Sequence, residues 1–196
     1  EILRGKADLL DPEGKEVLDF LTGDVHRFAR LVQDLLETSR IDAGAVNMRQ
    51  EEVRLSSYIR EVVDRRSGRP VTVSAGENAR TMIDRRLMDR VIENLLDNAE
   101  RYGRGVTRVS VEHGDGVARL LVDDAGPGVP PELRERIFER FARISAPLPE
   151  GADPGGAGLG LALVAENVRL HGGRVWVEDS PDGGARFVVQ LPLEMQ

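Results

Sequence analysis

The sequence predicts an α+β fold, in which a helical hairpin is followed by an α/β sandwich with helices on one face of a mixed sheet. Three observations predict it. Residues 15–44 repeat apolar side chains at alternating steps of four and three. Residues 107–124 and 174–192 alternate apolar and polar residues on either side of Gly-containing turns, as β-hairpins do. Helix-like segments, 84–103 and 159–171, lie between and before these hairpins.

The first third of the chain is predicted to be helical. Pro12 is suited to open a helix, Asp11 to cap it, and Gly44 to end it. Residues 1–7 are then expected to be the tail of a preceding antiparallel helix. The narrow apolar seam on the main helix needs a partner, so a homodimer that forms a four-helix bundle is expected. The seam consists of Leu21, Val25, Phe28, Val32 and Leu35.

Near residues 44–54 the helical repeat of apolar residues gives way to mixed helix and strand patterns. This change predicts a domain boundary, with residues 1–45 in the hairpin and residues 46–196 in the sandwich. In the second part, residues 55–68 are predicted to form a helix and residues 70–75 a short strand. Asp84 is the expected cap of the helix over residues 85–102. Residues 133–141 are predicted to form a short helix, and the Pro- and Gly-rich residues 145–156 a flexible loop.

Composition narrows the classes of function. The chain has 196 residues and a formal net charge of −7, which argues against a nucleic-acid-binding surface. It has no cysteine, so disulfides and thiolate metal sites are excluded. No apolar run approaches the roughly 20 residues that a membrane-spanning helix needs. The sequence begins in mid-pattern without Met, and we expect it to be part of a longer protein.

The segment "DPGGAGLGLALVAENVRLHGG", residues 153–173, places glycines directly before a helix. It matches neither the P-loop nor the dinucleotide-binding pattern, because Leu161 follows Gly160 and the spacing is G-x-G-x-G. Glycines without a Cβ, next to the free N–H groups of a helix start, still favour phosphate. A surface loop that merely enters a helix is the alternative.

The helix over residues 85–102 carries a second, polar stripe beside its apolar one. Asn94, Asn98, Arg101 and Tyr102 are spaced i, i+4, i+7 and i+8. Asparagine is a mediocre helix former, and its amide oxygen is a suitable Mg²⁺ ligand beside phosphates and waters. A solvated helix face is the alternative.

The stretch "VDDAGPGVP" ends a predicted strand with two carboxylates and then turns sharply. A carboxylate held at a strand end can accept a hydrogen bond from an amino group such as that of adenine. A turn capped by aspartates is the alternative.

Taken together and in this order, these segments resemble the catalytic region of bacterial sensor histidine kinases, whose ATPase fold is shared with gyrase and heat-shock chaperones. The resemblance covers nearly the whole chain. "RFARLVQDLLETSRIDAG" resembles the second helix of the dimerisation and phosphotransfer hairpin, and "ENLLDNAERYG" resembles the N box. "DDAGPGVP", "IFERFAR", "GGAGLGLALV" and "DGGARFVVQLP" resemble the first glycine box, the F box, the second glycine box and the last glycine box.

The resemblance implies an ATP site with Mg²⁺, in which Asn98 is the metal ligand and Asn94 faces the phosphates or the water shell of the metal. It gives Asp124 the adenine amino group and Arg143 the γ-phosphate, so that Asn94 and Arg143 are the expected catalytic residues. Ala185 stands where the family commonly has Thr or Ser, and only a backbone contact is expected there. The other implied ATP-binding residues are Arg101, Tyr102, Gly126, Gly128, Phe138, Arg140, Phe141, Gly156, Gly158, Leu159, Gly160 and Leu161.

The resemblance also implies an acceptor histidine on the first hairpin helix, in a stretch like S-H-E-L-R-T-P-L. None of His26, His113 and His171 lies in such a stretch, and we predict structural or surface roles for them. The acceptor is therefore expected upstream of residue 1.

The predicted function is that of an ATP-dependent protein-histidine kinase of a two-component system, which passes phosphate to a response-regulator aspartate. Its expected location is the cytoplasmic side of a parent anchored in the bacterial inner membrane. Two alternatives stay open. One is a serine kinase that restrains a sigma factor, which resembles the sandwich but lacks the hairpin. The other is a non-catalytic dimerisation module.

Overall fold

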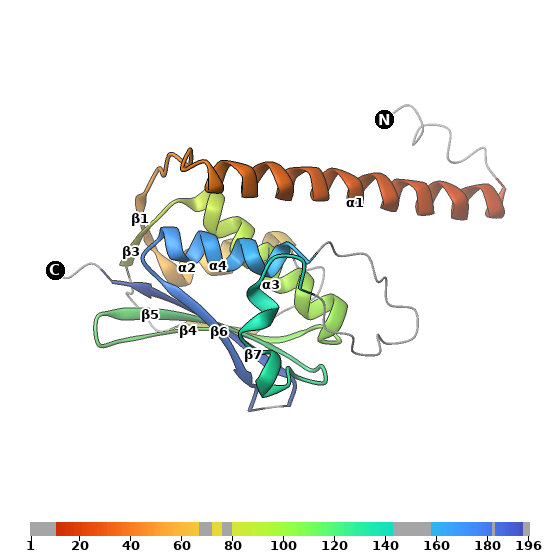
Figure 1. Cartoon of the computed structure of the whole chain (residues 1–196). Helices are drawn as coiled ribbons and strands as arrows, with labels where there is room; N and C mark the ends of the chain where they lie inside the picture. The colour runs from red at the N-terminus through yellow and green to blue at the C-terminus, as the bar shows by residue number, and fades with distance from the viewer. Residues whose placement is uncertain (1–10, 67–71, 76–79, 143–157, 182, 194–196) are drawn as a thin grey trace. The chain divides into compact units, whose positions relative to one another are not determined.

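The structure is a computed structural model that describes residues 11–66, 72–75, 80–142, 158–181 and 183–193 (Figure 1). The chain divides into two compact units, Glu1–Ala45 and Val46–Gln196.

The described part of the first unit is one long helix, α1 (Pro12–Asp42). Its cap is the predicted one, since the Gly14 N–H donates to Asp11 Oδ1 at 2.8 Å. Gly44, with φ +62°, follows its end as expected. The predicted preceding helix over residues 1–7 lies outside the described residues.

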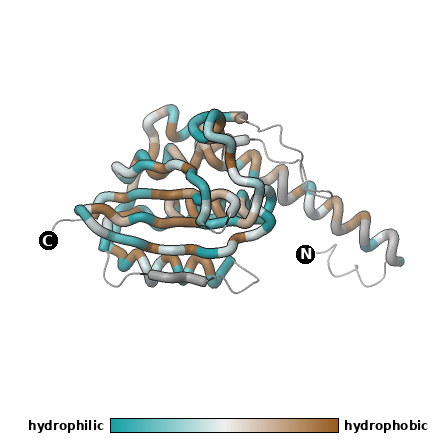
Figure 2. The backbone as a smooth tube through the Cα atoms, turned by 90° about the horizontal axis from the view of Figure 1, so that it is seen from below, coloured by the Kyte–Doolittle hydropathy of each residue, from teal (hydrophilic) through white to brown (hydrophobic). Residues whose placement is uncertain are grey.

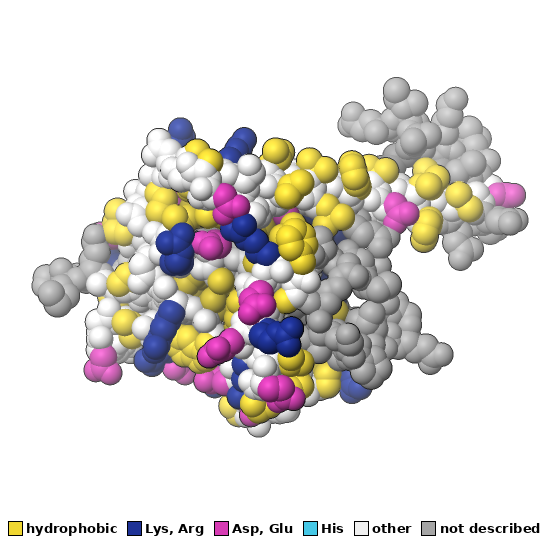
Figure 3. Space-filling model, viewed as in Figure 1, with side chains coloured by type: hydrophobic (Ala, Val, Ile, Leu, Met, Phe, Trp, Pro, Cys, Tyr) yellow, Lys and Arg dark blue, Asp and Glu magenta, His cyan; other side chains and the backbone are white. Residues whose placement is uncertain are grey.

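Helix α1 carries an exposed apolar seam along its length, visible as yellow side chains in Figure 3. The exposed fractions run from 40% at Val32 to 69% at Phe28. Isolated apolar side chains are common on protein surfaces, but a continuous helical seam of this kind marks an interaction surface. Its members include all five predicted seam residues and also Val17, Phe20 and Leu36.

The second unit is built on a five-stranded mixed sheet in the order β2-β4-β5-β7-β6. Strand β2 is parallel to β4, and the other neighbours are antiparallel. Figure 2 views this unit from below, where apolar and polar segments alternate along the strands. The strands are β2 (Thr72–Ala75), β4 (Val106–Gly114), β5 (Val117–Asp124), β6 (Arg174–Asp179) and β7 (Ala185–Pro192).

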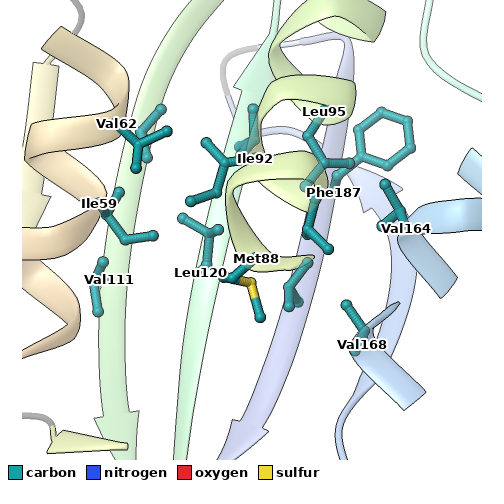
Figure 4. Packing of buried hydrophobic residues seen from close by; sticks show 14 of the residues in the cluster. Ile59, Val62, Met88, Ile92, Leu95, Val111, Leu120, Val164, Val168 and Phe187 are labelled. Carbon is teal, nitrogen blue, oxygen red and sulfur yellow. The ribbon is translucent and has the colours of Figure 1, made fainter. Parts of the chain in front are cut away.

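Three helices cover one face of this sheet (Figure 1). They are α2 (Leu55–Arg66), α3 (Arg85–Tyr102) and α4 (Gly160–Leu170). Figure 4 shows the core between the layers, where Met88, Ile92 and Leu95 of α3 point toward Leu120 and Phe187 of the sheet. The apolar stripe predicted for α3 is thus buried, and the fold is the predicted sandwich with helices on one face.

A small second sheet joins the first residues of the second unit to the strand that directly precedes α3. It pairs β1 (Glu51–Arg54) antiparallel with β3 (Arg80–Ile83). The Thr81 hydroxyl donates to the Pro192 carbonyl at 2.8 Å, which ties this sheet to the end of β7. Neither strand was expected from the sequence, because each is only four residues long and lacks clear alternation.

The turn between β4 and β5 has the predicted hairpin geometry. Asp115 and Gly116 have φ values of +51° and +75°, as a two-residue loop of the I′ kind requires.

The predicted helix over residues 133–141 is wrong. Only two single 3₁₀ turns form there, η2 (Pro131–Leu133) and η3 (Arg136–Phe138). The prolines hold the start of the segment in extended and 3₁₀ geometry, with Pro130 at ψ 137°, and Glu139 is again extended at ψ 150°. One buried side chain, Ile137, and the partly buried Phe138 and Leu133 pack on the core, which is too narrow a contact to stabilise a longer helix.

Candidate functional site

The site is built around Asp124, the last residue of β5. Its side chain is buried, with 3% of its surface exposed. Oδ1 accepts hydrogen bonds from the N–H groups of Gly126 and Ala185, both at 2.9 Å. All the hydrogen bonds that described residues donate to this carboxylate go to Oδ1, so Oδ2 keeps its capacity to accept a donor from a ligand.

Glycines enclose Asp124 closely. A Cβ on Gly103 would lie 2.4 Å from Asp124 Cβ, and a Cβ on Gly184 would lie 2.2 Å from the Asp124 carbonyl oxygen. A Cβ on Gly126 would lie 2.7 Å from Gly103 Cα. No real Cβ tolerates such distances, so these positions need glycine for close packing as much as for conformation. The result is a carboxylate bounded by backbone.

Asp123 has a different role from its neighbour. Alternation along the strand turns it to the opposite face of the sheet. It is fully buried there and accepts two hydrogen bonds from Arg186, at 2.6 Å to Nε and 2.9 Å to Nη2. Hydrogen bonding to Asp123 raises the pKa of Arg186. Of these two neighbouring carboxylates, Asp123 is therefore engaged by Arg186, whereas Oδ2 of Asp124 can still accept a hydrogen bond.

A second cluster joins α3 to the start of α4. A Cβ on Gly160, the first residue of α4, would lie 3.2 Å from Asn94 Oδ1. Leu159, the residue before it, is buried at 4% exposure and caps α4 without a side-chain hydrogen bond. Asn94 therefore faces the helix end that carries free N–H groups and the positive end of the helix dipole.

Helix α3 connects the two clusters. Asn94 lies in its second half, and Gly103, which caps its end, touches Asp124 and accepts the Ala125 N–H at 2.9 Å. At 1.5 Å per residue, about 14 Å of helix axis separate these points. Asn98 and Arg101 lie between them and are half-buried, while Tyr102 is 41% exposed.

The 3₁₀ segment and the start of α4 meet at a backbone contact. The Phe141 N–H donates to the Gly158 carbonyl at 2.9 Å, and both residues have positive φ, +62° and +70°. A Cβ on Gly158 would lie 2.8 Å from the Ala142 carbonyl oxygen, so glycine is required there.

The two phenylalanines of this segment differ sharply. Phe138 packs edge-to-face on Phe187 of β7, with ring centroids 6.4 Å apart, and so fastens the segment to the core. Phe141, by contrast, is 65% exposed.

Several predicted residues receive less support. Arg143 and Gly156 lie outside the described residues. Arg140 is exposed, and Leu161 packs at the edge of the core. Gly128 lies close to Gly184, because a Cβ added to Gly128 would be 3.4 Å from the Gly184 carbonyl oxygen. Gly103 and Gly184 were missed as site residues by the sequence reading, although each adjoins a motif residue in sequence.

His171 has the structural role that its position beside the glycine pair predicts. It is buried, its Nε2 accepts the Asp84 N–H at 2.9 Å, and its Nδ1 lies 2.6 Å from the Asn167 carbonyl. Since Nε2 accepts, Nδ1 carries the proton and the ring is neutral. His26 lies within α1 and His113 near the end of β4.

The described residues contain no group of three or more His, Asp or Glu side chains arranged to hold a metal ion. None of the helices they form has the length and apolar character that crossing a bilayer requires.

Known proteins resemble this chain in the same regions. Residues 83–195 match the model of the histidine kinase-, DNA gyrase B- and HSP90-like ATPase family. The signal transduction histidine-protein kinase AfsQ2 of Streptomyces coelicolor is 32% identical over 97% of this chain, which spans 35% of AfsQ2.

Two solved structures extend the comparison. Full-length ShkA in complex with AMPPNP matches 95% of this chain and 40% of its own, at 27% identity and a TM-score of 0.75. The histidine kinase ThkA in complex with the response regulator protein TrrA matches 98% of this chain and 55% of its own, at 25% identity and a TM-score of 0.70.

Proposed function

Since this chain belongs to the histidine kinase-, DNA gyrase B- and HSP90-like ATPase family, we propose that it is the ATP-binding and dimerisation region of a two-component protein-histidine kinase. The observation that carries the proposal is the enclosed Asp124 carboxylate, at one end of the helix that carries Asn94 and Asn98. The AMPPNP complex of ShkA supports ATP as the substrate.

Asp124 would bind the adenine ring through its exocyclic amino group. The backbone N–H groups of Gly126 and Ala185 donate to Oδ1, so Oδ2 would accept a hydrogen bond from the amino group of adenine. Gly126 and Gly128 would leave room for the base, and Tyr102 would pack on it. Ala185 brings no hydroxyl to this contact, and its N–H serves Asp124 instead.

The phosphates would lie along α3 toward the start of α4. Asn94 faces Gly160, and the N–H groups at this helix end suit an anion. The amide oxygen of Asn98 would bind Mg²⁺, with phosphates and waters as the remaining ligands. When bound, Mg²⁺ neutralises charge on the phosphates. The other ATP-binding residues in this proposal are Arg101, Phe138, Arg140, Phe141, Arg143, Gly156, Gly158, Leu159 and Leu161.

The remaining parts of the proposal concern partners. The exposed seam of α1 would pair with a second copy in a four-helix bundle, because its side chains are too apolar to stay in water. The acceptor histidine would lie before residue 1, in a parent protein anchored in the bacterial inner membrane with this region on the cytoplasmic side. The phosphate would pass to a response regulator, a partner supported by the ThkA–TrrA complex.

Nucleotide titration tests the site. ATP should bind more tightly with Mg²⁺ than with EDTA, and Asn98→Ala should remove that difference while leaving the EDTA affinity within about twofold. Glu100→Ala, on the exposed side of the same helix, is the matched control. Binding that is equal in both buffers, or an Asn98→Ala variant that keeps the metal effect, would overturn the assignment. A non-catalytic module would bind no nucleotide.

A further inference from the structure

A buried carboxylate, Asp84, ties the start of α3, the end remote from Asp124, to two other segments of the chain. It caps α3, with its Oδ1 accepting the Arg86 N–H at 3.1 Å. Only 1% of its surface is exposed. The proposed nucleotide contacts do not involve Asp84. Besides capping its own helix, it makes hydrogen bonds to residues far away in the sequence.

The first segment at Asp84 is the connecting chain that leads from α1 into β1, whose residues 46–50 begin the second unit. Asp84 Oδ2 accepts the N–H of Arg49 at 2.8 Å, across 35 positions of sequence. Arg86 Nη2 lies 2.9 Å from the same Oδ2 and 3.5 Å from the Asn47 carbonyl oxygen. The connecting chain between α1 and β1 is therefore bound to the second unit before strand β1 begins.

The second segment is the end of α4. The Asp84 N–H donates to His171 Nε2, so both the backbone and the side chain of Asp84 make contacts outside its own helix. Helix α4 starts at Gly160 beside Asn94 and ends at this point, and α3 runs the other way between the same two places. Two packed helices thus lead from the connecting chain to the proposed nucleotide site.

We propose that Asp84 is a positioning residue that fixes where the connecting chain leaves the catalytic unit, and so sets the reach of the bound γ-phosphate to the acceptor histidine. This inference rests on the proposed kinase function. Release of the contact would free Arg49 and Gln50 up to the start of β1, which adds about 7 Å of extended chain. Phosphoryl transfer is sensitive to such freedom, because a misplacement of about 1 Å can cost roughly 100-fold in rate.

The chain offers a matched pair of variants for the test. Arg49→Pro removes the N–H that Asp84 accepts, whereas Arg49→Ala keeps it and removes only an exposed side chain. Asp84→Asn is the complementary change, since Asn caps helices as well as Asp but offers one acceptor oxygen in place of two.

Autophosphorylation should be measured in the parent kinase over a range of ATP concentrations. We expect Arg49→Pro and Asp84→Asn to lower kcat at least tenfold with KM for ATP within about twofold of wild type, and Arg49→Ala to match wild type. A purely structural role would lower the melting temperature without this selective loss of kcat. Equal kcat for Arg49→Pro and Arg49→Ala would overturn the proposal. If Asp84→Asn fails to fold, the Arg49 pair decides alone.

Hydrogen exchange in the 196-residue chain separates this inference from the proposed function. The Arg49 amide should exchange at least tenfold faster in Asp84→Asn than in wild type, with or without nucleotide. Rapid exchange of that amide in the wild-type chain would refute the anchor even if ATP binds normally. A chain that does not bind ATP but protects this amide would refute the kinase site and leave the anchor in place.

Discussion

The hydrogen bonds of Asp124 allow its structural and ligand-binding roles to be separated by two substitutions. Asp124→Ala leaves the N–H groups of Gly126 and Ala185 without their acceptor. Each unsatisfied buried donor costs about 1–3 kcal/mol, so the loss of the acceptor for two donors should lower the free energy of unfolding by about 2–6 kcal/mol. That is a large part of the roughly 5–15 kcal/mol available to a domain.

Asp124→Asn should behave differently. Its amide oxygen can take the place of Oδ1 and keep both backbone hydrogen bonds, so stability should fall by no more than about 1 kcal/mol. Its NH₂ group then stands where Oδ2 was and faces the donor of the ligand. The loss of a hydrogen bond to a charged acceptor is worth about 2–3 kcal/mol, or roughly 30- to 150-fold in the Kd for ATP.

Calorimetric titration with ATP and urea unfolding without nucleotide measure the two quantities separately. Asp115→Asn, in the exposed β4–β5 turn, controls for the loss of one negative charge. The reasoning fails if Asp124→Asn binds ATP as tightly as the control, or if Asp124→Ala is as stable as Asp124→Asn.

Three further predictions concern other parts of the chain. Gly160→Ala places a Cβ 3.2 Å from Asn94 Oδ1, so thermal unfolding should show unchanged or slightly higher stability while ATP affinity drops several-fold; unchanged affinity would mean that Asn94 does not face the ligand. Phe28→Glu puts a charge in the α1 seam; sedimentation should show dimers for the wild type and for Lys15→Glu but monomers for Phe28→Glu, and a monomeric wild type would contradict the proposed pairing. Burial raises the pKa of Asp84, but the hydrogen bonds from Arg86 and the Arg49 N–H outweigh it and hold that pKa below its ordinary value. The stabilisation that the Asp84 carboxylate provides is therefore complete above about pH 4 and is lost as the pH falls through the lowered pKa. In urea unfolding, the difference in stability between wild type and Asp84→Asn should close below about pH 4. A difference that persists at about pH 2 would contradict this prediction.

The sequence predicted elements with long, regular patterns and missed those with short ones. Helices α1 and α3 combine periodic apolar residues with side-chain caps at Asp11 and Asp84, and both caps are confirmed. Strands β1 and β3 have four residues each, and their paired residues lie far apart in the sequence, from 26 positions for Arg54 and Arg80 to 32 positions for Glu51 and Ile83. No local pattern reveals such a pairing. The segment around Ile137 has a helix-like composition, but proline geometry and a narrow contact with the core prevented a helix.

Sequence motifs predicted candidate site residues whose side chains carry chemical groups. They did not predict residues that matter because of how closely the backbone packs. Asp124 was distinguished from Asp123 through the glycine-box pattern, and the Arg186 ion pair gives that distinction a physical cause. Gly103 and Gly184 escaped notice because their importance lies in the space they leave beside Asp124, and only the assembled backbone shows this. The link from Arg49 to Asp84 likewise joins residues whose proximity depends on the fold.

Strand β7 is the last strand along the chain, yet it occupies an interior place in the sheet, between β5 and β6. During synthesis β5 and β6 emerge before β7. They do not pair with each other in the sheet, so neither can complete its pairing until β7 has been made. The sandwich therefore cannot close on the ribosome until residues 185–192 have left the exit tunnel, and the earlier strands wait with open edges that are prone to aggregation. Loss of this one strand would also separate β6 from the rest of the sheet, because β7 is the strand that joins β6 to β5.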